Sequence, residues 1–338
     1  MSTTIIREQV QGPSAWLGVR LESRDYEIRV TDKEVTDLER AMRDVISRGK
    51  TWGAFERSDF PLPVFSTRLG QIEEQLRHGL GFVLLRGLPV ERYSMDELKT
   101  IYWGIGTHLG NAVTQNARRD IIGQVEDVKP TGTDDPNFRP YQNTSELDPH
   151  CDYADIVGLL CVDRAASGGR SSLASSVSVY NRIVREHPEY IDALYEGFYH
   201  ALRGEGPTGD PRETAPVAVP IYHWNNDRLW CWFHRKIIRL GMQYREIGLT
   251  PLQQEIFDYI EASGRDPEIR LDMTLEPGDL QLINNYTTLH YRTKYEDDEH
   301  HHRLLLRLWL NLRGEDQLDP EIARWVRRGI PGKISADS

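Results

Sequence analysis

The segment from residue 303 to residue 312 constrains the fold of this chain more than any other stretch, because its residue types alternate strictly. Side chains of a β-strand point to opposite faces with a period of two. One face would therefore carry leucine alone, at positions 304, 306, 308, 310 and 312. The opposite face would carry Arg303, Leu305, Arg307 and Trp309. Such a strand predicts a sheet that buries its leucine face in a core.

The two arginines leave three arrangements open. If the leucine face is the only core, Arg303 and Arg307 lie on solvent-exposed surface. If the sheet also closes over a cavity, both guanidinium groups point into that cavity. A buried arginine is costly unless it is paired, and its planar fork binds a carboxylate through two charge-assisted hydrogen bonds. A helix with the arginines four positions apart is the third arrangement, but strict alternation favours the strand.

Strand-like segments dominate the second half of the chain. Short apolar runs bounded by turn residues predict strands, and these lie at 81–90, 156–162, 219–224, 228–233, 268–275 and 280–285. Capping residues and apolar periodicity predict helices, at 34–49, 69–79, 94–109, 179–187, 188–197, 251–264 and 321–328. A parallel βαβ architecture would need regular crossover helices, which the second half lacks. We therefore expect a mainly β fold, an antiparallel sandwich or jelly roll decorated by helices.

Composition excludes several classes of protein. The formal net charge of −11 argues against a general nucleic-acid binder, which would present a basic face. No stretch approaches the ~20 apolar residues of a membrane span, and no signal peptide is evident. Three cysteines are too few for a disulfide framework or a zinc cluster. We expect a reduced, cytoplasmic protein; its oligomeric state, a homo-oligomer included, stays open.

A His-x-Asp pair and a distant histidine supply the most specific chemistry. His150 and Asp152 project to the same side of an extended backbone, and His290 follows much later in the chain. Two histidines and one carboxylate are the protein ligands of the facial triad that holds non-haem Fe(II) in oxygenases. Arg303, soon after His290, suits the binding of an anionic co-substrate. Cys151 would point the other way, as a small buried hydrophobe.

Other polar segments are weaker candidates. His300, His301 and His302 follow acidic residues in a polar loop, which favours solvation over metal binding. The aperiodic segment 201–216 is a long loop, and long ordered loops are often lids or binding loops. No glycine-rich phosphate loop and no serine nucleophile elbow is present. Candidate pocket residues, for which structural hydrogen bonding is the alternative role, are Tyr141, Gln142, Asn143 and Asn285.

Five motifs in order resemble the Fe(II)/2-oxoglutarate-dependent dioxygenases, specifically the taurine dioxygenase-like (TauD/TfdA) branch. They cover most of the chain and are the strand at 81–90, His150-Cys151-Asp152, Gly168-Gly169-Arg170-Ser171, Gly278-Asp279-Leu280 through Asn285 to Leu289-His290, and Arg303 to Arg307. Two features depart from the commoner pattern. Cys151 stands where threonine is frequent, and an acidic, histidine-rich loop extends the gap between His290 and Arg303.

The resemblance implies a double-stranded β-helix, the jelly-roll core of clavaminate synthase-like enzymes. It implies a single domain over 1–338, with a helical extension at 1–60 and the core with insertions at 80–313. It implies His150, Asp152 and His290 as Fe(II) ligands. Arg303 and Ser171 would bind the distal carboxylate of 2-oxoglutarate. Arg307 matches a position that binds an anionic substrate in some members, and a second arginine serves 2-oxoglutarate in others.

The implied reaction consumes O2 and 2-oxoglutarate, releases succinate and CO2, and abstracts hydrogen from a small-molecule substrate. Hydroxylation and desaturation are both compatible with these residues, and the substrate, anionic or zwitterionic, is not identified by them. A metal-free jelly-roll module that binds a small ligand is one alternative. A zinc-type hydrolase or isomerase with the same three ligands is another.

Overall fold

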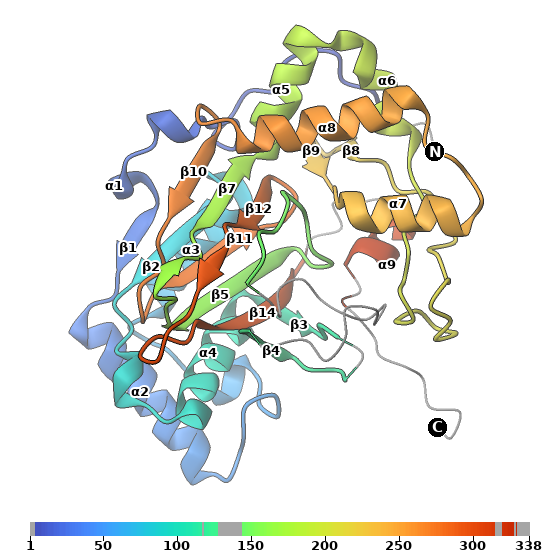
Figure 1. The fold of residues 1–338 in the computed structure, drawn as a ribbon. Coiled ribbons are helices and arrows are strands. Elements are labelled where there is room, and N and C mark those ends of the chain that lie inside the picture. Colours follow the sequence, from blue (N-terminus) through green and yellow to red (C-terminus); the bar gives the residue numbers. More distant parts are fainter. Residues whose placement is uncertain (1–3, 117, 128–143, 315–319, 328, 330–338) are drawn as a thin grey trace.

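The computed structural model describes residues 4–116, 118–127, 144–314, 320–327 and 329. Its largest element is a seven-stranded sheet in the order β1-β2-β11-β5-β14-β3, with β4 also paired to β14 (Figure 1). Neighbouring strands are antiparallel except β1 and β2. The strands are β1 (Glu27–Arg29), β2 (Phe82–Arg86), β3 (Gly110–Val113), β4 (Ile122–Val125), β5 (Ile156–Asp163), β11 (Leu280–Asn284) and β14 (Leu304–Leu312).

A smaller antiparallel sheet lies against one face of the large one. Its strands, in the order β10-β7-β12, are β10 (Arg270–Met273), β7 (Ser171–Ser175) and β12 (Thr288–Arg292). Phe82, Ile283 and Leu305 from the large sheet meet Leu173 and Met273 from the small sheet in one apolar cluster. Two antiparallel sheets packed face to face form the jelly-roll core, so the expected fold class is confirmed.

Two short ribbons extend this core. β6 (Ser167–Gly168) pairs with β13 (Tyr295–Glu296), and β8 (Tyr222–Asn225) forms a hairpin with β9 (Arg228–Cys231). Asn226 and Asp227, which join β8 to β9, both have positive φ, of 51° and 56°. Two left-handed residues are what a tight hairpin turn needs, and the turn lies between the strands predicted at 219–224 and 228–233.

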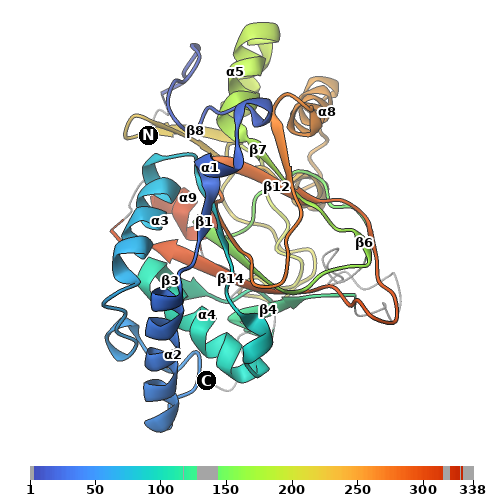
Figure 2. The same cartoon turned by 90° about the vertical axis from the view of Figure 1, so that its left-hand side faces the viewer.

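Helices cover the outer faces of the two sheets (Figures 1 and 2). α2 (Asp32–Ser47), α3 (Ser66–His78) and α4 (Met95–Leu109) share a core with the large sheet. α5 (Ser176–Glu186), α6 (Ile191–Glu196) and α8 (Pro251–Arg265) share another core with the β8–β9 hairpin. The remaining helices are α1 (Ser23–Tyr26), α7 (Arg235–Tyr244) and α9 (Pro320–Val326). None of the helices in the described ranges combines the length and apolar character that a membrane crossing requires.

Strand β14 has the two faces that its sequence predicted. Leu306, Leu308 and Leu310 are buried in the core shared with α2, α3 and α4. On the opposite face Arg303 and Arg307 are only 6% and 7% exposed, and both line a cavity between the sheets. Of the three arrangements that the sequence left open, the structure therefore shows the strand with its arginines turned inward.

Several helices begin at the residues that the sequence indicates. Thr31, Ser94 and Thr250 each form a capping box with the residue three positions later, at the start of α2, α4 and α8. A capping box provides acceptors for two backbone N–H groups at the start of a helix.

Strand β12 and helix α7 were not among the predicted elements. The division into an extension at 1–60 and a core at 80–313 stays a prediction.

The leucine face of β14 allows a direct test of this packing. Leu306→Ala should lower the free energy of unfolding by about 2–5 kcal/mol, because the fully buried side chain leaves a cavity. Leu252→Ala, at a position 42% exposed on α8, is the matched control and should change it by less than about 0.5 kcal/mol. Urea unfolding of both variants measures the difference; equal losses would contradict the assigned faces.

Candidate metal centre

One cavity lies between the two sheets, and its described lining comes from several distant parts of the chain. The segment 146–153, strands β5, β7, β12 and β14, and the start of α7 all contribute side chains to it. His150, Asp152 and His290 line this cavity together with Arg303, Arg307 and Ser171. The closure of the sandwich thus brings together the residues on which the predicted metal and co-substrate sites depend.

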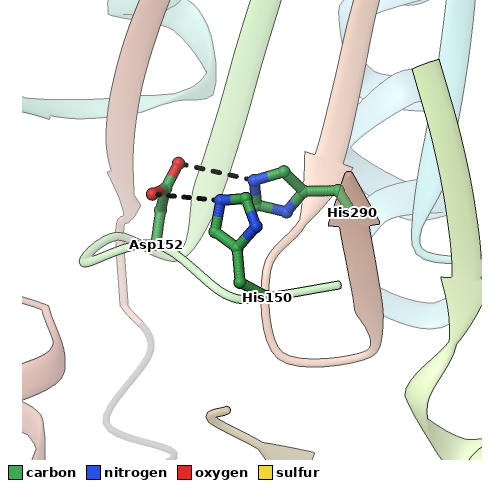
Figure 3. A group of neighbouring side chains, drawn as sticks. All are labelled: His150, Asp152 and His290. Atoms are coloured by element: carbon green, nitrogen blue, oxygen red, sulfur yellow. Dashed lines mark ion pairs between the residues drawn. The ribbon is translucent and has the colours of Figure 1, made fainter. Parts of the chain in front are cut away.

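The backbone holds the two histidines beside each other. His150 and His290 form an isolated antiparallel bridge, in which each backbone N–H donates to the other's carbonyl oxygen at 3.1 Å. Figure 3 shows both rings turned toward the carboxylate of Asp152. Nε2 of His290 lies 3.5 Å from Asp152 Oδ2, and Nε2 of His150 lies 3.9 Å from Asp152 Oδ1. One ligand atom from each residue falls within 4.8 Å of the other two.

The carboxylate of Asp152 is buried and surrounded by donors. The Trp309 indole donates to Asp152 Oδ2 at 3.1 Å, and Arg307 Nη1 lies 3.8 Å from the same oxygen. Burial by itself raises the pKa of Asp152, but the hydrogen bond from His290 and the charge of Arg307 outweigh it. The pKa therefore lies well below its usual range. The carboxylate is ionised at neutral pH, as a metal ligand must be.

The protonation of His150 also suits a metal ligand. Its Nδ1 lies 2.7 Å from the backbone carbonyl oxygen of Asp148, so Nδ1 carries the proton and Nε2 keeps its lone pair. Burial, and next the nearby His290, lower the pKa of His150 to about 4. The ring is therefore neutral at pH 7. The donor set fits a divalent metal that prefers imidazole and carboxylate ligands in a facial arrangement, such as Fe(II).

Arg303 lies on the same cavity wall as Ser171 and is almost completely buried. Its Nη1 has no hydrogen-bond partner among the described residues, and burial lowers its pKa. The Ser171 hydroxyl donates to Gln281 Oε1 at 2.8 Å. A buried guanidinium with a spare donor is costly unless an anion pairs with it. The site therefore fits a carboxylate ligand.

The Gly168-Gly169 pair leaves room for Arg303. Both glycines have positive φ, of 71° and 67°, which other residues adopt only with strain. A Cβ on Gly168 would lie 2.1 Å from the Lys294 carbonyl oxygen, and one on Gly169 would lie 3.2 Å from Arg303 Nε. The motif thus lets β6 pair with β13 beside the arginine.

Arg307 lies closer to the metal ligands. Its Nε donates to Gln115 Oε1 at 2.6 Å, and Gln115 Nε2 donates to the backbone carbonyl oxygen of Arg307 at 2.7 Å. Its guanidinium carbon lies 4.5 Å from the centroid of the Trp309 ring. Gln115 was not identified from the sequence, because no local pattern links it to a strand almost 200 positions away.

The side chain of Asn285 is hydrogen-bonded to the backbone of Asp152. Its Oδ1 accepts from the backbone N–H of Asp152, and its Nδ2 donates to the Asp152 carbonyl oxygen, both at 2.7 Å. The side chain is fully buried and is not part of the described cavity lining. Substrate binding by Asn285 stays a prediction, and these hydrogen bonds support its alternative, structural role. Tyr141, Gln142 and Asn143 lie outside the described residues.

Most charged side chains of the described cavity lining are cationic. The described lining carries six lysine or arginine side chains, namely Arg203, Arg235, Lys236, Arg292, Arg303 and Arg307, against the three carboxylates of Glu146, Asp148 and Asp152. The ring of His234 lies 5.0 Å from that of His150, centroid to centroid. Alternation along β12 could have identified Arg292, because it lies two positions after His290.

The sequence is similar to known dioxygenases and hydroxylase-like proteins. Residues 46–309 match the family described as "Taurine catabolism dioxygenase TauD, TfdA family". FR-33289 synthase of Streptomyces rubellomurinus (strain ATCC 31215) is 31% identical over 95% of this chain and 96% of its own length. The taurine hydroxylase-like protein SAT17 of Stachybotrys chartarum (strain CBS 109288 / IBT 7711) is 25% identical over 94% of this chain and 81% of its own length.

The fold resembles solved oxygenase structures. Asparagine oxygenase, in complex with Fe(II), 3-hydroxyasparagine and succinate, superposes with a TM-score of 0.64 at 14% identity, over 85% of this chain and 93% of that one. The non-heme iron oxygenase OrfP, in complex with Fe and alpha-ketoglutaric acid, gives a TM-score of 0.60 at 12% identity, over 84% and 94%. The family match spans most of the sequence, and the chain therefore belongs to the TauD, TfdA family and is an Fe(II)/2-oxoglutarate-dependent dioxygenase.

Proposed function

We propose that His150, Asp152 and His290 hold Fe(II) in this dioxygenase, and that Arg303 with Ser171 binds the distal carboxylate of 2-oxoglutarate. The observation that carries the proposal is the convergence of the three ligand side chains in a cavity that also contains a buried arginine. When bound, Fe(II) and 2-oxoglutarate would activate O2, the oxidant: one oxygen atom enters succinate as CO2 is released, and the other serves to oxidise the substrate.

The protein's own contribution is to hold the ligands and exclude water. Asn285 binds both the backbone N–H and the backbone carbonyl oxygen of Asp152, and the Trp309 indole orients the Asp152 carboxylate. The bridge between His150 and His290 fixes the spacing of the two imidazoles. Such supporting contacts keep ligands in the geometry that a metal requires. The metal can therefore bind without a large rearrangement of the chain.

We further propose that the primary substrate is a small anionic or zwitterionic molecule. The excess of cationic side chains in the described lining favours negative charge. Arg307 is the candidate for direct contact, because it lines the cavity close to Asp152. A relative that is 25% identical over 44% of this chain is named uridine-5'-phosphate dioxygenase, and an OrfP structure contains (3S)-hydroxy-L-arginine. Both names describe small polar substrates.

The loop 201–216 is proposed as the lid of this cavity. Arg203 from the loop is buried and lines the cavity. Backbone bridges between Phe198 and Val219 and between Ala201 and Thr214 hold the base of the loop.

The expected cytoplasmic location is supported by three buried cysteines that form no disulfide. Homo-oligomer formation stays a prediction.

The proposed function is tested by adding Fe(II) and 2-oxoglutarate to anaerobically purified protein and recording the weak visible absorption band of the chelated complex. The wild-type protein should show the band and, after O2 is admitted with a suitable substrate, convert 2-oxoglutarate to succinate. A screen of amino acids, sulfonates, phosphonates and carboxylates covers the proposed substrate class. A protein that binds iron without ever showing the band would contradict the proposal.

Removal of a proposed ligand should abolish metal binding. Asp152→Ala and His290→Ala should each retain less than about one tenth of the wild-type iron after anaerobic desalting, since each removes one of three protein ligands. Asp148→Asn is the matched control, because its exposed carboxylate lines the cavity but pairs with Arg265. Metal analysis of the desalted proteins provides the measurement. Full iron content in both ligand variants would refute the assignment.

Asn285→Ala should weaken iron binding about 10–100-fold, because it frees the backbone groups that flank the Asp152 side chain. Asn284→Ala is a matched control: its side chain is also buried but bonds to Leu76 and Tyr286, away from the ligands. Both variants should lose stability, by about 1–3 kcal/mol. Only Asn285→Ala should change the Fe(II) dissociation constant in a competition titration; equal changes would mean a purely structural role.

Arg303→Ala should raise the concentration of 2-oxoglutarate needed for half-maximal intensity of the visible absorption band by about 100-fold or more. The reason is that the distal carboxylate loses its buried partner. Arg170→Ala, at an exposed neighbour of Ser171, should leave this concentration unchanged. The iron content of both variants should equal that of the wild type, which separates co-substrate binding from metal binding. An unchanged requirement in Arg303→Ala would exclude Arg303 from the co-substrate site.

A further inference from the structure

A second arginine, Arg292, lies beside Arg303 at the wall of the cavity. It is the last residue of β12 and is 4% exposed. Because it follows His290 by two positions on the same strand, its side chain points to the same face as that ligand. Arg292 lies directly opposite Ser171 in the β12–β7 register, and both line the cavity with Arg303.

Both guanidinium groups contact the ring of Tyr295. The guanidinium carbon of Arg292 lies 4.7 Å from the ring centroid, and that of Arg303 lies 5.1 Å from it. Both side chains are almost completely buried, with Arg292 4% and Arg303 6% exposed. Two like charges are therefore held in a poorly solvated place, which is unfavourable without a compensating anion.

Among the described residues, Arg303 in particular has little compensation for its buried charge. The negative charge of Asp297 stabilises the charged form of Arg303, and that of Asp127 stabilises the charged form of Arg292. Arg303 forms no salt bridge with any described residue. Its Nη1 and the Tyr295 hydroxyl are both buried, and neither has a hydrogen-bond partner among the described residues. Nη2 of Arg292 donates to the Ser145 carbonyl oxygen, which orients the guanidinium. Arg292 and Arg303 thus line the same cavity as Ser171 and give this part of it a positive charge that suits an anion.

We propose that Arg292 binds the distal carboxylate of 2-oxoglutarate together with Arg303, with the Tyr295 hydroxyl as a further donor. The carboxylate then lies between two guanidinium groups instead of on one. This inference rests on the proposed function, because it takes Arg303 as a co-substrate residue. Its consequence is selectivity: a 2-oxo acid must carry a second carboxylate to neutralise the pair.

The test measures binding and requires no turnover. Fe(II)-loaded protein is titrated under nitrogen, in a calorimeter, with 2-oxoglutarate and with 2-oxopentanoate, which has the same carbon chain without the distal carboxylate. Arg292→Gln should raise the Kd of 2-oxoglutarate about tenfold or more, as expected for a lost charge-assisted hydrogen bond. The Kd of 2-oxopentanoate should change less than about twofold, because it has no group for Arg292 to bind.

Companion variants separate binding from a structural role. Arg292→Lys keeps the charge but not the planar fork, so its Kd for 2-oxoglutarate should lie between those of the wild type and Arg292→Gln. Tyr295→Phe keeps the ring and should weaken 2-oxoglutarate selectively, by a few-fold. Arg170→Gln is the exposed control and should bind both acids as the wild type does.

The outcomes distinguish the two proposals. If Arg292→Gln weakens both acids equally or neither, while Arg303→Gln still weakens 2-oxoglutarate alone, the inference about Arg292 is overturned and the proposed function stands. If the wild type discriminates between the acids no better than Arg303→Gln does, both proposals fail. Selective weakening in Arg292→Gln, Tyr295→Phe and Arg303→Gln supports the paired-arginine site.

Discussion

The ionised carboxylate of Asp152 is the constraint around which this site is organised. A buried charge costs several kcal/mol unless donors and opposite charges surround it. Asn285 and Trp309, which lie 133 and 157 positions along the chain from Asp152, supply the backbone clamp and the indole donor. Arg307 supplies the nearest full positive charge. Arg307 and Trp309 belong to β14, and Asn285 directly follows β11, so Asp152 meets these partners only when the strands of the large sheet have paired. We therefore expect metal binding to be coupled to folding of the core.

The cavity depends equally on what covers the other side of the large sheet. Helices α2, α3 and α4 bury the leucine face of β14, so the arginine face is free to point between the sheets. The two faces of one strand thus divide the protein into an apolar outer layer and a charged interior. Apolar neighbours such as Leu159 and Leu305 limit water in this interior. Low polarity strengthens each interaction between the buried arginines and an anion.

Local signals predicted the elements that local physics determines. The capping boxes at Thr31, Ser94 and Thr250 satisfy helix ends within four residues, so the sequence shows where α2, α4 and α8 begin. The alternation of β14 likewise revealed both of its faces. Strand β12 was not predicted, although its five residues, Thr288 to Arg292, alternate between polar and apolar side chains. The strand is short and both of its faces are buried, so the alternation does not separate a solvent face from a core face. The inward position of Arg292 was missed with it, and the position of Asn285 behind the ligand could not be seen in a single segment.

The sequence by itself determined the kinds of ligand, their order along the chain and the two faces of the strand that carries Arg303 and Arg307. Those properties are local, or they belong to motifs that remain in order whatever the fold. Only the tertiary structure decided which groups meet: the bridge between His150 and His290, the clamp of Asn285 on Asp152, and the two arginines around Tyr295. Such contacts join residues that no sequence period relates, because their spacing is set by strand register and by the packing of one sheet on the other.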